Sequence, residues 1–318
     1  AGADAARIVD VDAPAEAGAF PVTIEHAFGE TTIEEAPERV VTWGWGSADA
    51  AIALDVIPVA IPFDDYAGDD EGVLPWIREA VEAKGADLPA RLPKTQELPV
   101  EAVLSYEPDV VLAAYSGLTQ EEYDALTAAG VAVVAYPGEA WSTPWRDLIE
   151  IVGTALGRSE EAAALLEDID DQVAAAAAAN PELAGKSVAL VWDAADTFYV
   201  YKAADARAEF LLDLGMVTAP SVDELATDES TFYFTLSKER LGELESDVLV
   251  AFADTQAQMD AFLESDYAQL MSQVRDGRVA QVVGPDFVSA VSPPTALSLT
   301  WGLEEYVRLI AEAAAVAG

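Results

Sequence analysis

The chain has 318 residues, of which 52% are hydrophobic, and its 58 acidic and 16 basic side chains give a formal net charge of −42. A chain of this length and composition is expected to fold into two ordinary domains with buried cores, and its charge repels nucleic acid and anionic membrane surfaces. Because cysteine is absent, disulfides, thiol catalysis and thiolate metal sites are excluded.

Seven short apolar runs, rich in β-branched residues and bounded by turn residues, predict buried parallel strands. An alternating segment before them, VTIEHAFGETTI, predicts an edge hairpin, and helix-period segments such as 121–129 and 210–214 lie between them. This alternation favours an α/β architecture with mainly parallel sheets. The predicted strands cover residues 40–43, 58–61, 110–114, 131–135, 188–192, 248–252 and 279–283.

A segment of about 35 residues without a strand signal separates the fourth predicted strand from the fifth. Thr143 and Pro144 are typical of a helix start, and Asn180 precedes the proline that ends it. We expect one long helix here, with Gly153 and Gly157 as candidate breaks or kinks. The sequence thus predicts an extended segment 1–20, an N-terminal α/β lobe 21–143, a linking helix 144–180 and a C-terminal α/β lobe 181–318.

An internal similarity indicates that the two lobes have related designs. VEAVLSYEPDVVLAA, residues 100–114, aligns without gaps on KERLGELESDVLVAF, residues 238–252, and pairs Glu101 with Glu239 and Asp109 with Asp247. Each copy predicts a short helix, a turn and a buried strand. A chance match between two acidic, valine-rich segments is the alternative explanation.

Few residues suit metal binding or nucleophilic catalysis. His26 is the only histidine, and its place in the predicted hairpin favours a structural or surface role over metal ligation. The segment GWGS, residues 44–47, completes neither a phosphate-binding loop nor a nucleophile elbow. Nothing singles out a carboxylate pair for glycoside hydrolysis. We therefore expect a binding protein without a metal site or intrinsic cofactor, with a carbohydrate-active enzyme as the alternative.

Aromatic residues follow almost every predicted strand. In α/β folds ligands bind at the carboxyl ends of the strands, so these residues are candidates for ligand contact, while a place in the core is the alternative for each. Gly44 and Gly46 are expected to let the backbone approach the ligand, and a place in the core is the alternative for at least one of Trp43 and Trp45. The candidates are Trp43, Trp45, Ser47, Phe63, Tyr66, Tyr115, Tyr136 and Trp141 in the first half and Trp192, Tyr199, Arg207, Phe232, Tyr233 and Phe287 in the second.

The sequence resembles the substrate-binding proteins of ABC importers for ferric siderophores, cobalamin and related iron complexes. The resemblance implies two α/β lobes joined by a rigid helix, a ligand cleft between them, modest lobe closure and delivery of the ligand to a membrane permease. Glu101 and Glu239 match the glutamates that dock onto permease arginines in this family, with a plain surface role as the alternative. The resembling segments, in order from about residue 20, are IEHAFGETTIEEAPERVV, SADAAIALDVIPVAI, LPVEAVLSYEPDVVLA, LIEIVGTALGRSEEAAALL, FLLDLGM and LSKERLGELESDVLVAF.

The residues favour an uncharged or cationic ferric hydroxamate as the ligand. Family members that bind catecholate or citrate complexes surround these anions with arginines, whereas here only Arg207 is expected near the cleft, with Lys202 and Arg146 as weaker candidates. Arg207 is expected to bond hydroxamate oxygens or to pair with Asp205 or Glu209. Cobalamin or haem is the alternative ligand, although haem usually requires an axial side chain.

The resemblance also implies a monomer outside the cytoplasm, either free in the periplasm or anchored as a lipoprotein. No apolar run reaches the roughly 20 residues that a membrane span needs, and the opening AGADAARIVD does not resemble a signal peptide. A signal or lipid anchor is therefore expected outside this sequence. The expected partners are a ferric siderophore and an ABC permease, and iron enters only within the siderophore complex.

Overall fold

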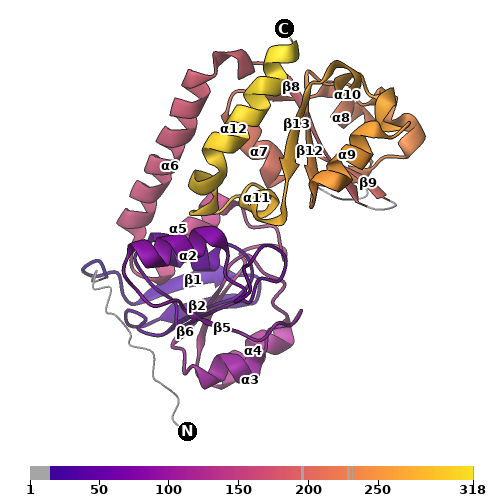
Figure 1. Ribbon diagram of the computed structural model, residues 1–318. Coiled ribbons are helices and arrows are strands. Elements are labelled where there is room, and N and C mark those ends of the chain that lie inside the picture. Colours follow the sequence, from indigo (N-terminus) through magenta and orange to yellow (C-terminus); the bar gives the residue numbers. More distant parts are fainter. Residues whose placement is uncertain (1–14, 195–196, 228–229, 231, 318) are drawn as a thin grey trace. The chain divides into compact units, whose positions relative to one another are not determined.

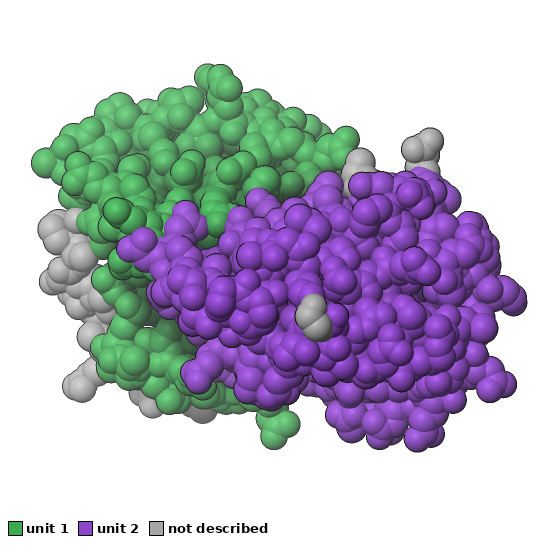
Figure 2. Space-filling view, turned by 90° about the horizontal axis from the view of Figure 1, so that it is seen from above, with its two compact units in different colours: residues 1–168, 295–297 green, residues 169–294, 298–318 purple. Residues whose placement is uncertain are grey.

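The computed structural model describes residues 15–194, 197–227, 230 and 232–317 (Figure 1). The described chain divides into two compact units, which Figure 2 colours green and purple. Unit 1 extends to Asp168 and includes residues 295–297, and unit 2 comprises Ile169–Pro294 and the residues from Ser298 onward. The chain therefore enters unit 2 at Ile169 and returns to unit 1 for three residues near its end.

Unit 1 contains a five-stranded parallel sheet in the order β5-β4-β3-β6-β7. Val41 of β3 is in register with Ala60 of β4 and Val111 of β6, and all three side chains are fully buried. Strands buried on both faces explain why these segments are continuously apolar. The strands are β3 (Val40–Thr42), β4 (Ala60–Ile61), β5 (Ala90–Arg91), β6 (Val110–Ala113) and β7 (Ala132–Ala135).

Helices cover both faces of this sheet. In Figure 1, α3 and α4 lie on one side of the strands, and α2 and α5 lie on the other. The cap of α4 is a capping box, in which Thr119 accepts a hydrogen bond from Glu122 N and the Glu122 carboxylate accepts one from Thr119 N. The helices of unit 1 are α1 (Ser47–Ala53), α2 (Pro75–Ala83), α3 (Val100–Ser105), α4 (Gln120–Ala128) and α5 (Trp145–Ala155).

The predicted hairpin is present as β1 (Val22–His26) and β2 (Gly29–Ile33), which form a separate two-stranded antiparallel sheet beside β7. Thr31 Oγ1 donates a hydrogen bond to Val133 O at 2.7 Å. His26 is buried, with Nε2 2.9 Å from Thr31 Oγ1, and its burial lowers its pKa. The histidine therefore has the structural role expected from its position.

The segment expected to form one helix over 144–180 forms two, α5 and α6 (Ser159–Ala179). Gly157 has a φ of 67°, and the chain ends α5 in a Schellman motif: Arg158 N donates to Gly153 O at 2.7 Å and Gly157 N to Thr154 O at 3.2 Å. A side chain at Gly153 would lie 2.5 Å from Ala162 Cβ. The two glycines therefore terminate α5 and allow α6 to pack closely against it.

Unit 2 contains a mixed sheet in the order β11-β9-β8-β12-β13, with β10 paired to β8. The pairs β8 with β12, β12 with β13 and β8 with β10 are parallel, whereas β8 with β9 and β9 with β11 are antiparallel. All seven strands predicted from apolar runs are thus present in the two sheets. The strands of unit 2 are β8 (Ser187–Ala194), β9 (Thr197–Tyr201), β10 (Val217–Thr218), β11 (Tyr233–Thr235), β12 (Val248–Ala253) and β13 (Val279–Val283).

In Figure 1, α7 and α12 lie on one side of this sheet and α9 on the other. The core on the α9 side joins Val191, Phe198 and Phe234 of three strands to Met259 and Phe262 of α9. No described helix is both long enough and apolar enough to cross a membrane. The remaining elements are η1 (Pro181–Leu183), α7 (Ala206–Asp213), α8 (Pro220–Leu225), η2 (Lys238–Glu243), α9 (Gln256–Glu264), η3 (Ala268–Leu270), α10 (Ser272–Asp276), α11 (Pro285–Ala290) and α12 (Ser298–Ala317).

The two similar sequence segments have the same local structure, with α3 leading to β6 and the 3₁₀ helix η2 leading to β12. The Asp109 carboxylate accepts hydrogen bonds from Glu38 N and Arg39 N, just before β3. The Asp247 carboxylate accepts one at 2.8 Å from Ser187 N, at the start of β8. In each unit the paired aspartate thus ties its strand to the start of the neighbouring strand, which favours a real repeat over a chance match.

Candidate functional site

Three aromatic residues come together where β3, β6 and β7 of unit 1 end. Trp45 N donates a hydrogen bond to Tyr115 O at 2.9 Å, and Trp141 N donates one to Ser116 O at 3.2 Å. The rings of Tyr115 and Trp141 lie 5.7 Å apart in a T-shaped arrangement. Trp45 and Tyr115 are half-buried, and Trp141 is 49% exposed. We call Trp45, Tyr115 and Trp141 the unit 1 aromatic surface.

Glycine is required for this assembly. Gly44 has a φ of 83°, and a Cβ there would lie 2.2 Å from Tyr115 O. The turn after β3 can therefore approach the turn after β6 only because residue 44 has no side chain. A side chain at Gly117 would lie 2.6 Å from Trp141 Nε1. Gly44 was expected to let the backbone approach a ligand. In the structure it instead lets the turn after β3 approach the turn after β6.

Trp43, Tyr136 and Ser47 lie in the interior of unit 1 rather than on this surface. Trp43 is 9% exposed and packs in the core that faces α3 and α4. The Tyr136 hydroxyl donates a hydrogen bond to Leu118 O at 2.9 Å, and its ring belongs to the same core. Ser47 is fully buried. Of the two tryptophans in TWGWG, the first therefore belongs to the core and the second to the surface.

Phe63 and Tyr66 belong to the loop that follows β4 at the same carboxyl edge. Phe63 is half-buried, and its ring lies where a side chain at Gly72 would be, 2.4 Å from that Cβ position. Tyr66 is 45% exposed, and its backbone N–H donates to Asp64 Oδ1. Tyr66 therefore presents its ring to solvent, whereas Phe63 helps to pack the loop.

A second aromatic group lies on one face of the unit 2 sheet. Trp192 of β8 is the cross-strand partner of Tyr199, and the rings of Tyr199 and Tyr233 lie 5.4 Å apart. Phe232, which is 37% exposed, has its ring 6.1 Å from that of Tyr233. Trp192, Tyr199 and Tyr233 are half-buried. We call these four residues the unit 2 aromatic surface. Phe287, by contrast, lies on α11 and packs 6.3 Å from the ring of Tyr306 of α12.

Arg207 lies beside this second surface and contacts three protein side chains. Its Nη1 is 2.8 Å from Asp205 Oδ2, its Nε donates to Ser292 Oγ, and its guanidinium lies 4.2 Å above the ring of Tyr201. Burial raises the pKa of Asp205 and opposes the effect of the arginine. The structure therefore confirms the expected ion pair between Arg207 and Asp205.

The other candidate cations are also engaged with protein groups. Lys202 Nζ donates to the carbonyls of Thr227 and Ser230 at 2.6 and 2.7 Å. The Arg146 guanidinium lies 4.1 Å above the ring of its neighbour Trp145.

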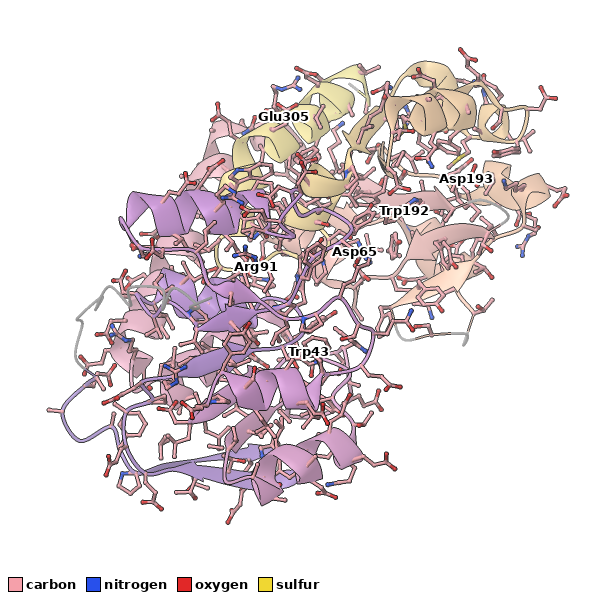
Figure 3. All side chains as sticks on the ribbon, turned by 60° about the horizontal axis from the view of Figure 1, so that its bottom comes forward. Trp43, Asp65, Arg91, Trp192, Asp193 and Glu305 are labelled. Carbon is pink, nitrogen blue, oxygen red and sulfur yellow. The ribbon has the colours of Figure 1, made fainter. Side chains whose placement is uncertain are left out.

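Two further cations lie near the carboxyl edge of the unit 1 sheet. Lys94 is 2.6 Å from Asp65, and Arg91 at the end of β5 is 3.6 Å from Glu71; Figure 3 labels Arg91 and Asp65. Neither aromatic surface thus carries a surplus of positive charge from these residues.

Sequence reasoning missed a buried carboxyl group that is bonded to Trp76, the neighbour of Trp45. Asp49 of α1 is 2% exposed, and its Oδ1 accepts hydrogen bonds from Trp76 Nε1 at 2.6 Å and from Thr295 Oγ1. Burial raises its pKa to about 6, against the opposing effect of the two hydrogen bonds. An aspartate between alanines in SADAAIA is the available sequence signal, and Thr295 lies 246 residues away.

The two glutamates of the similar segments are exposed in the first turns of their helices. Next to Glu239, Lys238 Nζ lies 3.0 Å from Asp193 of β8 and 4.3 Å above the ring of Tyr267. Figure 3 labels Asp193 beside Trp192 on β8. Before Glu101, the backbone N–H of Leu98 donates to Glu122 Oε1 at 2.7 Å. Each glutamate thus lies on a short helix. A hydrogen bond at Leu98 holds the start of the first helix, and an ion pair of Lys238 holds the start of the second.

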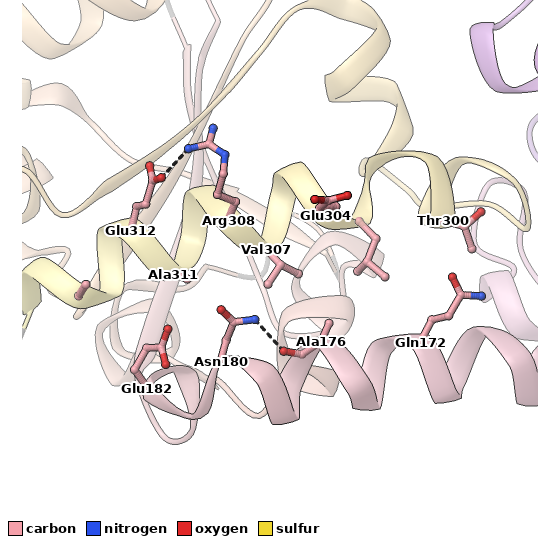
Figure 4. A pocket seen from close by; sticks show the side chains of 12 residues that line it. Gln172, Ala176, Asn180, Glu182, Thr300, Glu304, Val307, Arg308, Ala311 and Glu312 are labelled. Atoms are coloured by element: carbon pink, nitrogen blue, oxygen red, sulfur yellow. Dashed lines mark hydrogen bonds and ion pairs between the residues drawn. The ribbon is translucent and has the colours of Figure 1, made fainter.

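A hollow of about 670 Å³ lies between α6 and α12 of unit 2 (Figure 4). Its walls are mixed, with Leu303 and Val307 beside Gln172 and an ion pair between Arg308 and Glu312 at 2.6 Å. None of the predicted site residues lines it. This hollow is thus not where the aromatic groups gather.

Comparison with known proteins supports a binding function. Residues 40–282 match the family described as periplasmic binding protein. PiaA from Streptococcus pneumoniae TIGR4, solved in complex with ferrichrome, is 32% identical, with a TM-score of 0.83 over 93% of this chain and 100% of that chain. A periplasmic solute binding protein from Mycobacterium smegmatis is 25% identical, with a TM-score of 0.79 over 93% and 99% of the two chains.

A curated relative matches over a shorter span. It is the Fe(3+) dicitrate-binding periplasmic protein FecB of Escherichia coli, which is 27% identical over 165 residues. The match covers 52% of this chain and 52% of that protein, so the chain spans about half the length of this relative.

Proposed function

Because this chain belongs to the periplasmic binding protein family, we propose that it is the substrate-binding component of an ABC importer that captures a ferric siderophore. The observation that carries the proposal is the pair of aromatic surfaces, one in each unit: the unit 1 rings follow the carboxyl ends of strands, and the unit 2 rings lie on one face of the sheet. Rings in such positions bind large, partly apolar ligands. The similarity to PiaA over nearly the whole chain supports the same conclusion.

The ligand class follows from charge. A polyanionic ferric complex would need unpaired cations around it, because burying uncompensated charge is costly. Arg207 is paired with Asp205, and Lys94 and Arg91 are paired with acidic side chains. An uncharged or cationic ferric hydroxamate fits these surfaces better, and the ferrichrome complex of PiaA supports that class. Iron is then cargo within the siderophore, and the protein needs no cofactor of its own.

Ligand contact is assigned to residues whose rings are accessible. In unit 1 these are Trp45, Tyr115 and Trp141, with Tyr66 from the loop after β4. Exposed aromatic faces pack against the methylene chains of a hydroxamate siderophore, while hydroxyl groups can bond its oxygens. In unit 2 the corresponding residues are Trp192, Tyr199, Phe232 and Tyr233.

Delivery to a permease is assigned to Glu101 and Glu239. Both are exposed near the start of an anchored helix, and opposite charges on two partners orient their encounter and raise its rate. The protein then acts outside the cytoplasmic membrane, as a monomer, and a lipid anchor or free diffusion in the periplasm would serve equally.

The test is a titration of intrinsic tryptophan fluorescence with defined ligands. Ferrioxamine B supplies a cationic trihydroxamate and ferrichrome a neutral one, while ferric citrate, a ferric catecholate and cobalamin are the comparisons. Saturable quenching at sub-micromolar hydroxamate, weaker for every comparison, is the expected result. Preference for ferric citrate would overturn the ligand class. Absence of binding to all of them, or turnover of a glycoside, would overturn the function.

A further inference from the structure

The Asp49 carboxyl group has no place among the proposed ligand contacts, yet it is buried in unit 1 and bonded to the tryptophan that lies beside Trp45. Its Oδ1 accepts a hydrogen bond from the indole of Trp76 on α2 and another from the hydroxyl of Thr295. Asp49, Trp76 and Thr295 are each about 2% exposed. Three segments distant in sequence, α1, α2 and residues 295–297, therefore meet at one carboxylate oxygen.

Two of these segments also lie next to the turn that carries Trp45. The rings of Trp45 and Trp76 lie 6.4 Å apart in a T-shaped arrangement. Thr295 Cγ2 lies 3.6 Å from the position of a Cβ at Gly46, the residue between Trp45 and α1. One group bonded to Asp49, the Trp76 indole, thus lies next to the Trp45 ring, and the other, Thr295, lies next to the glycine that follows Trp45.

A carboxyl group is a costly choice for this position. Burial raises its pKa to about 6, which means that the protein environment disfavours the charged form. Among the described residues, the Asp64 carboxylate in the loop after β4 adds a smaller repulsion. A well-packed apolar residue commonly gives equal or greater stability at such a site. Stability alone therefore does not explain an aspartate here.

We propose that Asp49 is a positioning residue for ligand binding: by holding the Trp76 indole and the Thr295 hydroxyl on one oxygen, it fixes the orientation in which Trp45 contacts the ligand. The inference rests on the proposed function, because it assigns Trp45 a ligand. Asp49 itself does not touch the ligand and acts only through its two bonded partners. Bonds to an ionised acceptor are stronger and more directional than bonds between neutral groups, which suits a positioning role.

The test compares substitutions that alter the hydrogen bonds to Asp49 with substitutions that leave them intact. Asp49→Asn preserves size but removes the charge, and Thr295→Val removes the donated hydroxyl while preserving shape. Each should weaken ferrioxamine B binding about fivefold, the effect of losing about one net hydrogen bond. Thr295→Ser keeps a hydroxyl and should restore wild-type affinity. Ser298→Ala is the matched control, because it removes a buried hydroxyl that donates to Ala290 O at 2.7 Å in unit 2.

Two outcomes decide between positioning and plain structure. If Asp49→Asn and Thr295→Val lower affinity while Ser298→Ala lowers only the melting temperature, the inference is supported. If the first two variants also lower only the melting temperature and leave ferrioxamine B affinity unchanged, Asp49 is merely structural and the inference is overturned.

A ligand-free measurement keeps the inference separate from the proposed function. Two indoles at this separation couple in the near-ultraviolet circular dichroism spectrum, and the wild-type spectrum minus that of Trp45→Phe isolates their signal. The same difference taken in the Asp49→Asn background should be diminished, and the wild-type signal should titrate near pH 6. An undiminished signal would overturn the positioning role even if the wild type bound no siderophore.

Discussion

Separate replacement of Trp43 and Trp45 by alanine should give opposite patterns of loss, although the two residues are separated by a single glycine. Trp43 is 9% exposed and packs with Val111 and Leu126 in the core between the sheet and α3 and α4. Trp45 is half-buried on the surface that we assign to the ligand. The first substitution removes core packing, and the second removes a ligand contact.

The expected magnitudes follow from these positions. Removing a large core aromatic side chain costs about 3 to 5 kcal/mol of unfolding free energy. Trp45 buries less of its ring, so its removal should cost roughly half as much. A tryptophan at the centre of a binding surface contributes about 2 kcal/mol to binding, so Trp45→Ala should weaken ferrioxamine B binding about 30-fold. Trp43→Ala should change affinity less than threefold under conditions in which the variant is folded.

The assay combines urea unfolding with isothermal titration calorimetry on the same preparations. Calorimetry reports affinity without relying on the tryptophan signal that the substitutions remove. The reasoning is refuted if Trp43→Ala weakens binding as much as Trp45→Ala does, or if Trp45→Ala destabilises the protein by the full core amount without a loss of affinity.

Three other results are expected. Charge reversal of both Glu101 and Glu239 to arginine should abolish siderophore uptake by cells and leave the affinity of the purified protein within twofold; uptake at the wild-type rate would contradict the docking role. The pKa of Asp49 is raised from 3.8 to about 6, so the folded state binds the proton more tightly than the unfolded state, and unfolding free energy should fall by about 2 kcal/mol between pH 4 and pH 7 from this group. The Asp49→Asn variant should not show this pH-dependent fall in unfolding free energy. Urea unfolding of both proteins at several pH values measures the difference. Asp205→Asn should leave Arg207 without its ion-pair partner and raise affinity for ferric citrate severalfold relative to ferrioxamine B; an unchanged calorimetric ratio would contradict the charge argument.

The strands that sequence predicted best are the ones buried on both faces. Val40–Thr42 and Val110–Ala113 are short apolar runs because neighbouring strands and helices surround them. Strands β9 and β11 were not predicted, because they are antiparallel and one face carries the aromatic residues Tyr199 and Tyr233. Those rings look like loop or ligand residues until the pairing of the strands is known.

The candidate site was predictable only in outline. The position of aromatic residues after strands predicted that Trp45, Tyr115 and Trp141 lie together, because parallel strands bring their carboxyl ends to one edge; their contact with a ligand stays a prediction. The sequence could not show that Trp43 is in the core and Trp45 on the surface. That difference depends on the direction in which each side chain points after β3 ends, which only the folded turn determines. Asp49 was missed because its partner Thr295 lies 246 residues away, and such a pairing leaves no local pattern.

The helical linker shows the same limit at the level of backbone geometry. Gly153 and Gly157 were recognised as candidate breaks, but a glycine within a helix can also be tolerated. Whether the helix ends here depends on the hydrogen bond from Arg158 N to Gly153 O and on the close packing of Ala162 against Gly153. Both require the folded arrangement of α5 and α6.

The central claim, that a ferric hydroxamate contacts the aromatic surfaces, is tested most directly by fluorine NMR of the protein labelled with 5-fluorotryptophan. The chain has seven tryptophans, and single Trp→Phe variants assign their resonances. Gallium-loaded and iron-loaded desferrioxamine B are compared, because iron(III) is paramagnetic and broadens nearby resonances whereas gallium(III) does not. The account predicts that iron broadens Trp45, Trp141 and Trp192 more strongly than Trp301 of α12. Uniform line widths across all seven residues, or broadening centred on Trp301, would contradict it.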